Sequence, residues 1–158
     1  MSFKYNDGGR KEAGYKGDTG DCVARSIAIA SGLPYQVVYD TLAHGNLTQR
    51  KSKHTRSSDN KRTAAHGILT RRKWFKDYMK SLGFKWITTM RIGSGCKVHL
   101  SPDELPKGNL VIAVSKHYTA MIDGVINDTW DPRRQDESGR ETRCVYGYWE
   151  FDQMRINN

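Results

Sequence analysis

The sequence predicts a single α+β domain in which helices come first and an antiparallel sheet follows. Residues 22–82 carry most of the helical periodicity, whereas residues 84–151 contain β-branched and aromatic runs that favour strands. Asp123-Gly124 lies between two such runs and is a strong signal for a two-residue hairpin turn. The length suits one hydrophobic core, so residues 1–158 are expected to form one domain.

The first half of the chain reads as an irregular arm followed by helices. Residues 1–20 are rich in glycine and charge and show neither a helical nor a strand period. Apolar side chains then recur at helical spacing over residues 22–31, and Gly32 is a suitable helix terminator. Further helices are expected over about 34–43, opened by a proline, and over about 68–82.

The preference changes to strands after the third predicted helix. Ser101, with Glu104 three residues later, has in addition the pattern of a helix start. The turn at Asp123-Gly124 joins two strands directly, which predicts antiparallel pairing. The expected strands cover residues 84–90, 97–100, 109–115, 117–122, 125–130 and 144–151.

Bulk composition is that of a small globular protein. The chain is 37% hydrophobic and 10% aromatic, which is too high for a fully disordered chain. No apolar run approaches the roughly 20 residues that cross a bilayer, and the N-terminus lacks a signal-peptide core. Cys22, Cys96 and Cys144 are an odd number without paired spacing, which predicts reduced thiols. We therefore expect a cytoplasmic protein without a membrane segment.

Most of the positive charge lies in one segment of the chain. Of the net charge of +9, eight charges come from residues 50–73, which hold nine basic residues and one acid, Asp59. Residues 45–66 are polar and aperiodic, so a basic loop is expected there. Two interpretations stay open, a solvated loop and a patch that attracts nucleic acid or an acidic protein. The nine basic residues are Arg50, Lys51, Lys53, Arg56, Lys61, Arg62, Arg71, Arg72 and Lys73.

Cys22 is the first candidate for chemistry. It follows Gly20-Asp21 directly and opens the helix predicted over residues 22–31. The free N–H groups and the positive dipole end of a helix N-terminus favour thiolate, the nucleophilic form of cysteine. N–H groups of the same turn can also stabilise an oxyanion. A small buried residue is the alternative interpretation of this cysteine.

His117 and Asp128 are predicted to lie close together across the hairpin. A two-residue turn at Asp123-Gly124 places His117 opposite Trp130, and Thr119 opposite Asp128. Because side chains alternate along strands, these four residues share one face, where His117 and Asp128 are diagonal neighbours. The carboxylate would then orient the imidazole, with Trp130 keeping water away. The alternative is a His–Asp pair on the surface without a catalytic role.

The order of these residues resembles that of papain-like cysteine peptidases. These enzymes place a Cys at the start of their central helix, a His at the start of a strand, and an Asn or Asp on the next strand. Asp128-Thr129-Trp130 resembles the Asn-Ser-Trp motif of the papain branch, with Asp in place of Asn. Residues 117–124 are similar to the strand with the His, and residues 17–32 to the cysteine loop and helix. The chain also resembles small phage-encoded members of this group, which would act in the host cytoplasm.

The cysteine loop departs from the papain pattern. Gly20-Asp21-Cys22-Val23-Ala24 stands where the papain branch has its cysteine motif. Lys16 stands six residues before Cys22, where that branch keeps an oxyanion-hole Gln. The nearest upstream carboxamide is Asn6. The oxyanion donors are therefore expected to be Asn6 or the backbone N–H groups from Thr19 to Cys22, unless the oxyanion hole is incomplete.

The resemblance implies a thiol hydrolase acting on a protein or peptide. Such a peptidase, isopeptidase or amidase would use Cys22, His117 and Asp128 and pass through a thioester. No cofactor is expected, and no C-x-x-C or H-x-x-x-H spacing indicates a metal site. The alternative is a catalytically inert papain-like binding protein that uses residues 50–73 on nucleic acid or an acidic protein.

Overall fold

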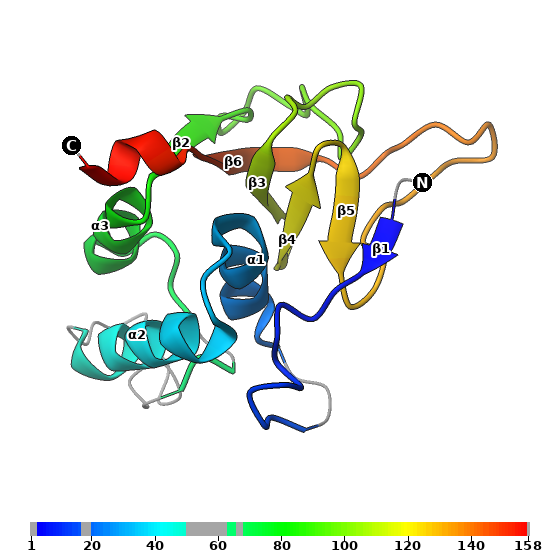
Figure 1. Ribbon diagram of the computed structural model, residues 1–158. Coiled ribbons are helices and arrows are strands. Elements are labelled where there is room, and N and C mark those ends of the chain that lie inside the picture. Colours follow the sequence, from blue (N-terminus) through cyan, green and yellow to red (C-terminus); the bar gives the residue numbers. More distant parts are fainter. Residues whose placement is uncertain (1–2, 17–19, 50–62, 66–67, 158) are drawn as a thin grey trace.

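The computed structural model describes residues 3–16, 20–49, 63–65 and 68–157 (Figure 1). In this part of the chain, three α-helices and a six-stranded mixed sheet confirm the predicted α+β class. The helices are α1 (Cys22–Ser31), α2 (Tyr35–Thr48) and α3 (Lys73–Ser81), and a short 3-10 helix covers Gln153–Asn157. The strands are β1 (Phe3–Tyr5), β2 (Phe84–Thr88), β3 (Asn109–Val114), β4 (His117–Ile122), β5 (Val125–Asp128) and β6 (Val145–Phe151).

The strands follow the order β1-β5-β4-β3-β6-β2 across the sheet. Only β1 is parallel to its neighbour, and it lies at one edge of the sheet, beside β5 (Figure 1). β4 and β5 form the predicted hairpin, and the pairs Ile122–Val125 and Ala120–Asn127 confirm its register. Asp123 and Gly124 have φ values of 46° and 86°, as a tight hairpin turn of this kind requires.

α1 is the central helix and packs on β4 and β3 (Figure 1). Its observed bounds are those predicted. The helix ends at Gly32, where a left-handed φ of 76° lets the glycine N–H bond to the Ala28 carbonyl at 3.0 Å. Its inner face, which includes Ala24 and Ile27, is fully buried against the sheet and joins a core that α2 and α3 complete.

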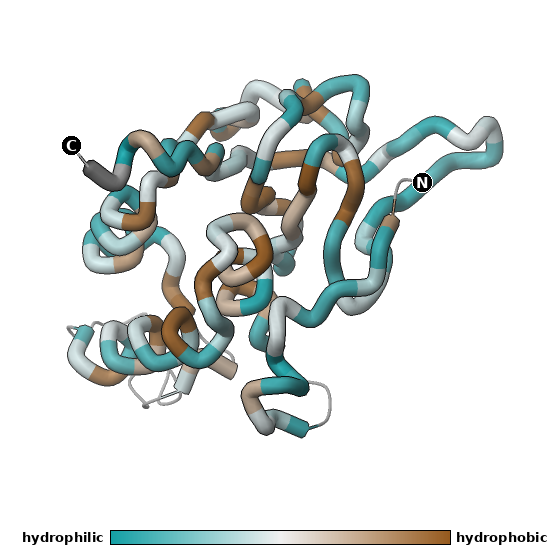
Figure 2. The backbone as a smooth tube through the Cα atoms, in the orientation of Figure 1, coloured by the Kyte–Doolittle hydropathy of each residue, from teal (hydrophilic) through white to brown (hydrophobic). Residues whose placement is uncertain are grey.

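A second core covers the opposite face of the sheet. Leu110, Ile112 and Val114 alternate along β3 and point into it, whereas Val111 points toward α1. Leu100 and Leu105, from the segment before β3, close this second core. In Figure 2, hydrophobic residues are concentrated in the central strands, whereas the arm between β5 and β6 is hydrophilic. β3, which pairs with β4, thus packs against a hydrophobic core on each face of the sheet.

Two helix bounds differ from prediction. α2 continues to Thr48, beyond the predicted end and into the predicted loop. The helix passes through Gly45, and the Trp74 indole lies so close to this glycine that a methyl group there would overlap it. α3 begins at Lys73 rather than near residue 68, because Arg72 has an extended backbone with ψ of 144°.

The N-terminal arm contains a strand that the sequence did not predict. Phe3–Tyr5 pairs in parallel with Ile126–Asp128. The Asn6 N–H continues this pairing with a 2.9 Å bond to the Asp128 carbonyl. A strand of three residues has no measurable period, so its formation depends on a partner more than a hundred positions away. β5 is consequently an inner strand of the sheet.

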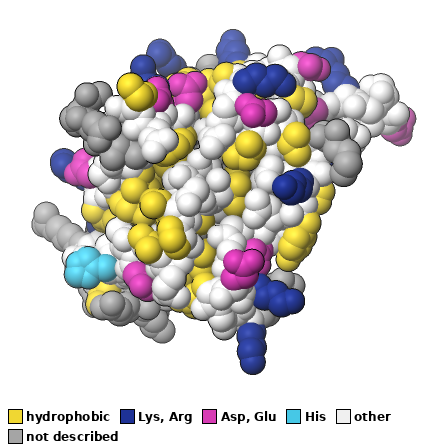
Figure 3. Space-filling view, in the orientation of Figure 1, with side chains coloured by type: hydrophobic (Ala, Val, Ile, Leu, Met, Phe, Trp, Pro, Cys, Tyr) yellow, Lys and Arg dark blue, Asp and Glu magenta, His cyan; other side chains and the backbone are white. Residues whose placement is uncertain are grey.

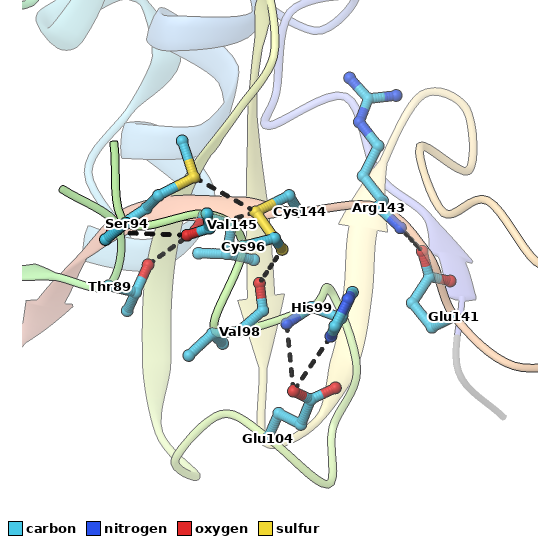
Figure 4. The surroundings of a disulfide bond; sticks show 12 residues. Thr89, Ser94, Cys96, Val98, His99, Glu104, Glu141, Arg143, Cys144 and Val145 are labelled. Carbon is cyan, nitrogen blue, oxygen red and sulfur yellow. Dashed lines mark hydrogen bonds and ion pairs between the residues drawn. A yellow bond between two sulfur atoms is a disulfide. The ribbon is translucent and has the colours of Figure 1, made fainter. Parts of the chain in front are cut away.

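The segment before β3 is less regular than predicted. In place of a strand over 97–100, a single bridge joins His99 to Cys144. The helix predicted at Ser101 does not form, because the Glu104 carboxylate binds the His99 N–H and ring instead of the Ser101 N–H (Figure 4). Turns occupy these positions.

The prediction of reduced thiols is wrong for two of the three cysteines. Cys96 and Cys144 form a disulfide with their Cα atoms 5.8 Å apart (Figure 4). The pair is separated by 48 positions and meets only because β6 begins beside the 96–99 segment. Sequence spacing alone could not indicate this proximity. Cys22 is left as the free thiol.

Charged side chains of both signs lie at several places on the face drawn in Figure 3. On the face drawn in Figure 3, hydrophobic side chains gather on the side of α1 and α2, and Lys and Arg side chains lie mainly around the periphery. Among the helices that the structure describes, none has both the length and the apolar character needed to cross a membrane.

Candidate active site

Cys22 begins α1 and lies at the wall of a cavity of about 750 Å³. The residue is partly exposed and its thiol is free. The N–H groups of Cys22 and Val23 belong to the first turn, where a helix has no internal acceptor for them. The helix therefore presents both hydrogen-bond donors and the positive end of its dipole near the thiol.

Asp21 precedes the helix but does not cap it with its side chain. The carboxylate is fully buried and accepts hydrogen bonds from Arg10, Arg25 and Tyr35. Burial and the Asp21 carboxylate raise the pKa of Tyr35, so this phenol stays protonated and donates. Because Asp21 is occupied in this way, it does not compete for the first-turn N–H groups beside Cys22.

His117 and Asp128 meet as the predicted register requires. His117 starts β4, Asp128 ends β5, and the imidazole Nε2 lies 2.7 Å from the Asp128 Oδ2. The Thr119 hydroxyl donates to the same oxygen at 2.7 Å, and the Thr129 N–H donates to the Asp128 Oδ1 at 2.7 Å. The Asp128 side chain is 3% exposed. The carboxylate is thus fixed in position and holds the ring in one orientation.

The environment of His117 favours its protonated form. Burial lowers the pKa of the imidazole, but hydrogen bonds to Asp128 and Cys22, with the charges of these groups, raise it overall to about 9. Burial raises the pKa of Asp128, whereas hydrogen bonds from His117 and Thr119 lower it to below its ordinary value overall. Because Asp128 engages Nε2, Nδ1 is the ring nitrogen left for Cys22. At neutral pH the imidazole is therefore protonated and lies beside the ionised Asp128 carboxylate.

Arg25 is a site residue that the sequence reasoning missed. Its guanidinium binds Asp21 through Nη1, and its Nη2 lies 3.5 Å from the Asp128 Oδ1. The Arg25 side chain is 7% exposed. A signal was present, because Arg25 is the one charged residue in a mostly apolar helical stretch, and a buried charge needs a partner.

Trp130 covers one side of the imidazole. The ring centroids of Trp130 and His117 are 4.7 Å apart, with 44° between the ring planes. The indole is itself 48% exposed, so it forms the boundary between the His117–Asp128 pair and solvent. That Trp130 keeps water away from the pair stays a prediction.

The cavity beside Cys22 and His117 is lined by α3, by the segment before it, and by strands of the sheet. Sequence analysis did not single out most of these residues, because each one reads locally as a solvated or core position. Two groups matter below. The cations are Arg71, Lys76, Lys80 and Lys116, and the most exposed aromatic residues are Trp86 and Tyr146.

The other predicted site residues lie away from Cys22 and His117, line the cavity, or fall outside the described residues. The Asn6 amide donates to the Asn127 Oδ1 at 3.1 Å and accepts the Gly8 N–H, so it is engaged on the arm. Thr19 is outside the described residues. Of the basic patch, Arg71 lines the cavity, Arg72 precedes α3, and Lys73 pairs with Asp77 at 2.6 Å. The others lie outside the described residues: Arg50, Lys51, Lys53, Arg56, Lys61 and Arg62.

The assembled groups define a possible chemistry. Nowhere in the described ranges do three or more His, Cys, Asp or Glu side chains gather to hold a metal ion. A partly exposed thiol, a protonated imidazole and a buried carboxylate are the groups needed for acyl transfer through a thioester. Comparisons of this chain with protein-family models, with curated proteins and with solved structures found no match.

Proposed function

We propose that this protein is a papain-like thiol hydrolase, a peptidase, isopeptidase or amidase, with Cys22 as nucleophile, His117 as acid and base, and Asp128 as the orienting carboxylate. We base this on one observation above all. Cys22 and His117 line the same cavity, and a partly buried 2.7 Å bond to Asp128 holds the imidazole. The placement of Cys22 at the start of α1, with His117 and Asp128 later in the chain on adjacent strands, supports the papain-like assignment.

Acylation begins from a thiolate–imidazolium pair. With the pKa of His117 near 9, the ring already carries a proton at neutral pH. The Cys22 thiolate attacks the substrate carbonyl carbon, and the electron pair moves to the carbonyl oxygen. N–H groups of the first turn of α1 stabilise the resulting oxyanion. Collapse of this intermediate breaks the bond to the leaving amine, which takes the proton from His117 and leaves a thioester on Cys22.

Deacylation returns the site to its starting state. The neutral His117 removes a proton from water as the water oxygen attacks the thioester carbon. Collapse of the second intermediate expels the Cys22 thiolate and releases the carboxylic acid product. His117 keeps the proton, so the thiolate–imidazolium pair is restored. Asp128 stays ionised throughout and stabilises the imidazolium.

Alkylation of Cys22 as a function of pH tests the proposal. Without reductant, Cys22 is the free thiol of the chain, so a mass shift with iodoacetamide is assigned to it. We expect rapid alkylation already near pH 6, and slow alkylation of His117→Ala at the same pH. Reactivity that appears only above about pH 8, as in an isolated cysteine, would contradict the proposal.

A second measurement follows the covalent intermediate. An activated ester such as p-nitrophenyl acetate should place an acetyl group on Cys22 and release nitrophenolate repeatedly. Cys22→Ala should do neither. A protein that is alkylated quickly but never turns over any activated ester would be the inert binding protein instead of a hydrolase.

A further inference from the structure

The cavity beside Cys22 is lined by positive charge. Arg71, Lys76, Lys80 and Lys116 contribute to it, and no Asp or Glu is among its described lining residues. Lys76 and Lys80 lie one turn apart on α3 and therefore share a face of that helix. Lys116 occupies the β3–β4 turn, directly before His117. The cations thus reach the cavity from different elements.

Among the described residues, these four cations take no part in the ion pairs of the fold. Other surface cations have partners, as Lys73 has Asp77 and Arg133 has Asp131. In the described part of the chain, none of the four cavity cations has an ion-pair partner. Unpaired like charges around a concave surface repel one another and produce a positive potential that attracts an anion.

Lys116 has a strained backbone. Its φ is 58°, a left-handed value that a residue other than glycine adopts at a cost. The strain lies in the two-residue turn between Val114 and His117, at the edge of the cavity. The conformation of Lys116 thus sets the direction of the chain directly before His117.

Aromatic side chains supply the apolar part of the cavity. Trp86 and Tyr146 are 37% and 39% exposed, which is unusual for large rings on packed strands. The Trp86 indole lies so close to Gly147 that a methyl group there would overlap it, so the glycine allows the ring this position. The cavity therefore combines an apolar contact surface with cations. A ligand that fits it carries both an apolar carbon chain and a negative charge.

We infer that the substrate of Cys22 is an acidic peptide segment, with Asp or Glu side chains near the scissile carbonyl that contact Arg71, Lys76, Lys80 and Lys116. This inference rests on the proposed function, because it concerns the acyl substrate of the same thiol. A peptide suits the site better than a nucleic acid, since a thiolate needs an acyl carbon to attack and nucleic acids contain none. The apolar part of the peptide lies against Trp86 and Tyr146.

Matched covalent probes test the inference. Short peptides ending in a vinyl sulfone alkylate a thiolate by addition to the vinyl carbon, and the labelled protein is measured by mass spectrometry. One probe carries a pair of Glu residues before the electrophile, and the other carries Gln at both positions. We expect the Glu probe to label Cys22 about five to ten times faster at low salt. This advantage should shrink between about 50 and 500 mM NaCl.

Charge variants locate the effect. Lys76→Gln combined with Lys80→Gln, and separately Lys116→Gln, should each reduce the Glu-over-Gln preference by at least about half. Lys85→Gln is the matched control. Lys85 is exposed on β2 and alternates with Trp86, so it points away from the cavity and its loss should leave the preference unchanged.

Iodoacetamide separates the two possible failures. It is small and uncharged, so its reaction at Cys22 near pH 6 reports the proposed function and not the charge preference. Normal iodoacetamide reactivity with equal rates for both probes would overturn the acidic-peptide inference and leave the hydrolase standing. Protection of Cys22 by a single-stranded oligonucleotide, together with equal rates for both probes, would also overturn it and indicate nucleic acid as the ligand.

Discussion

The Arg25 Nη2 lies 3.5 Å from the Asp128 Oδ1 inside the protein, and the same guanidinium binds Asp21. One side chain of the helix that carries Cys22 is thus connected to the carboxylate that holds His117. The thiol and the imidazole stand on different elements, so their separation depends on how α1 sits on the sheet. Arg25 fixes that placement with charge, in addition to the apolar packing of the helix.

Loss of Arg25 should strongly destabilise the fold. Arg25→Met leaves two buried carboxylates without this cation, and we expect the free energy of unfolding to fall by about 3–5 kcal/mol. Lys73→Met is the matched control, since Lys73–Asp77 is also an i,i+4 pair but its side chains are 88% and 53% exposed. Its loss should change stability by less than about 1 kcal/mol. Equal unfolding midpoints in urea for both variants would show that the buried network contributes little.

Stability should depend on pH through His117. Its folded pKa of about 9 lies above the ordinary value of about 6.5, so the folded state holds this proton more tightly. The contribution is therefore complete below about pH 6.5 and is lost as pH rises through 9, by roughly 3 kcal/mol at most. Urea unfolding measured between these limits checks this loss. In His117→Gln the same slope should be absent, and an equal slope in both proteins would assign it to another group.

Asp128 should set the protonation of His117. The hydrogen bond that the ring donates to Asp128 is the largest influence that raises the pKa of the ring, so Asp128→Asn should move this pKa from about 9 toward its ordinary value. Titration of the His117 ring by NMR measures this directly. Thr119→Val keeps the charge of Asp128 and removes one hydrogen bond to it, so a smaller shift is expected. A His117 pKa that stays near 9 in Asp128→Asn would contradict the assigned role of the carboxylate.

The disulfide should be measurable by thiol counting. Alkylation of the unfolded protein without reductant should modify Cys22 alone, and after reduction Cys96 and Cys144 as well. Because the bond closes a long loop, Cys96→Ser with Cys144→Ser should lower the free energy of unfolding by about 2–4 kcal/mol. Alkylation of all three thiols in unreduced protein would show that the bond does not form.

The features predicted correctly from sequence depend on local rules. The hairpin register follows from one turn signal and the alternation of side chains, and it was enough to choose Asp128 over Asp131 as the neighbour of His117. Asp131 instead pairs with Arg133. Helix α1 follows in the same way from its period and from Gly32.

The features missed depend on contacts between distant segments. β1 and the Cys96–Cys144 bond each join parts of the chain whose proximity only the folded sheet creates. Lys76 and Lys80 read as an ordinary solvated helix face, because nothing local shows that this face borders a cavity. Arg25 is different, since its position in an apolar helix could have marked it in advance.

The parallel pairing of β1 has a consequence for the order of assembly. Residues 3–5 leave the ribosome before their partner strand, which is synthesised more than a hundred residues later. The edge of the sheet beside Asp128 therefore closes only after residues 126–128 have been synthesised, when the helix with the thiol has already emerged. A nascent chain halted between residues 122 and 125 has Cys22 and His117 but not the strand that carries Asp128, so under the proposed mechanism the imidazole gains its orienting carboxylate only once β5 has been made.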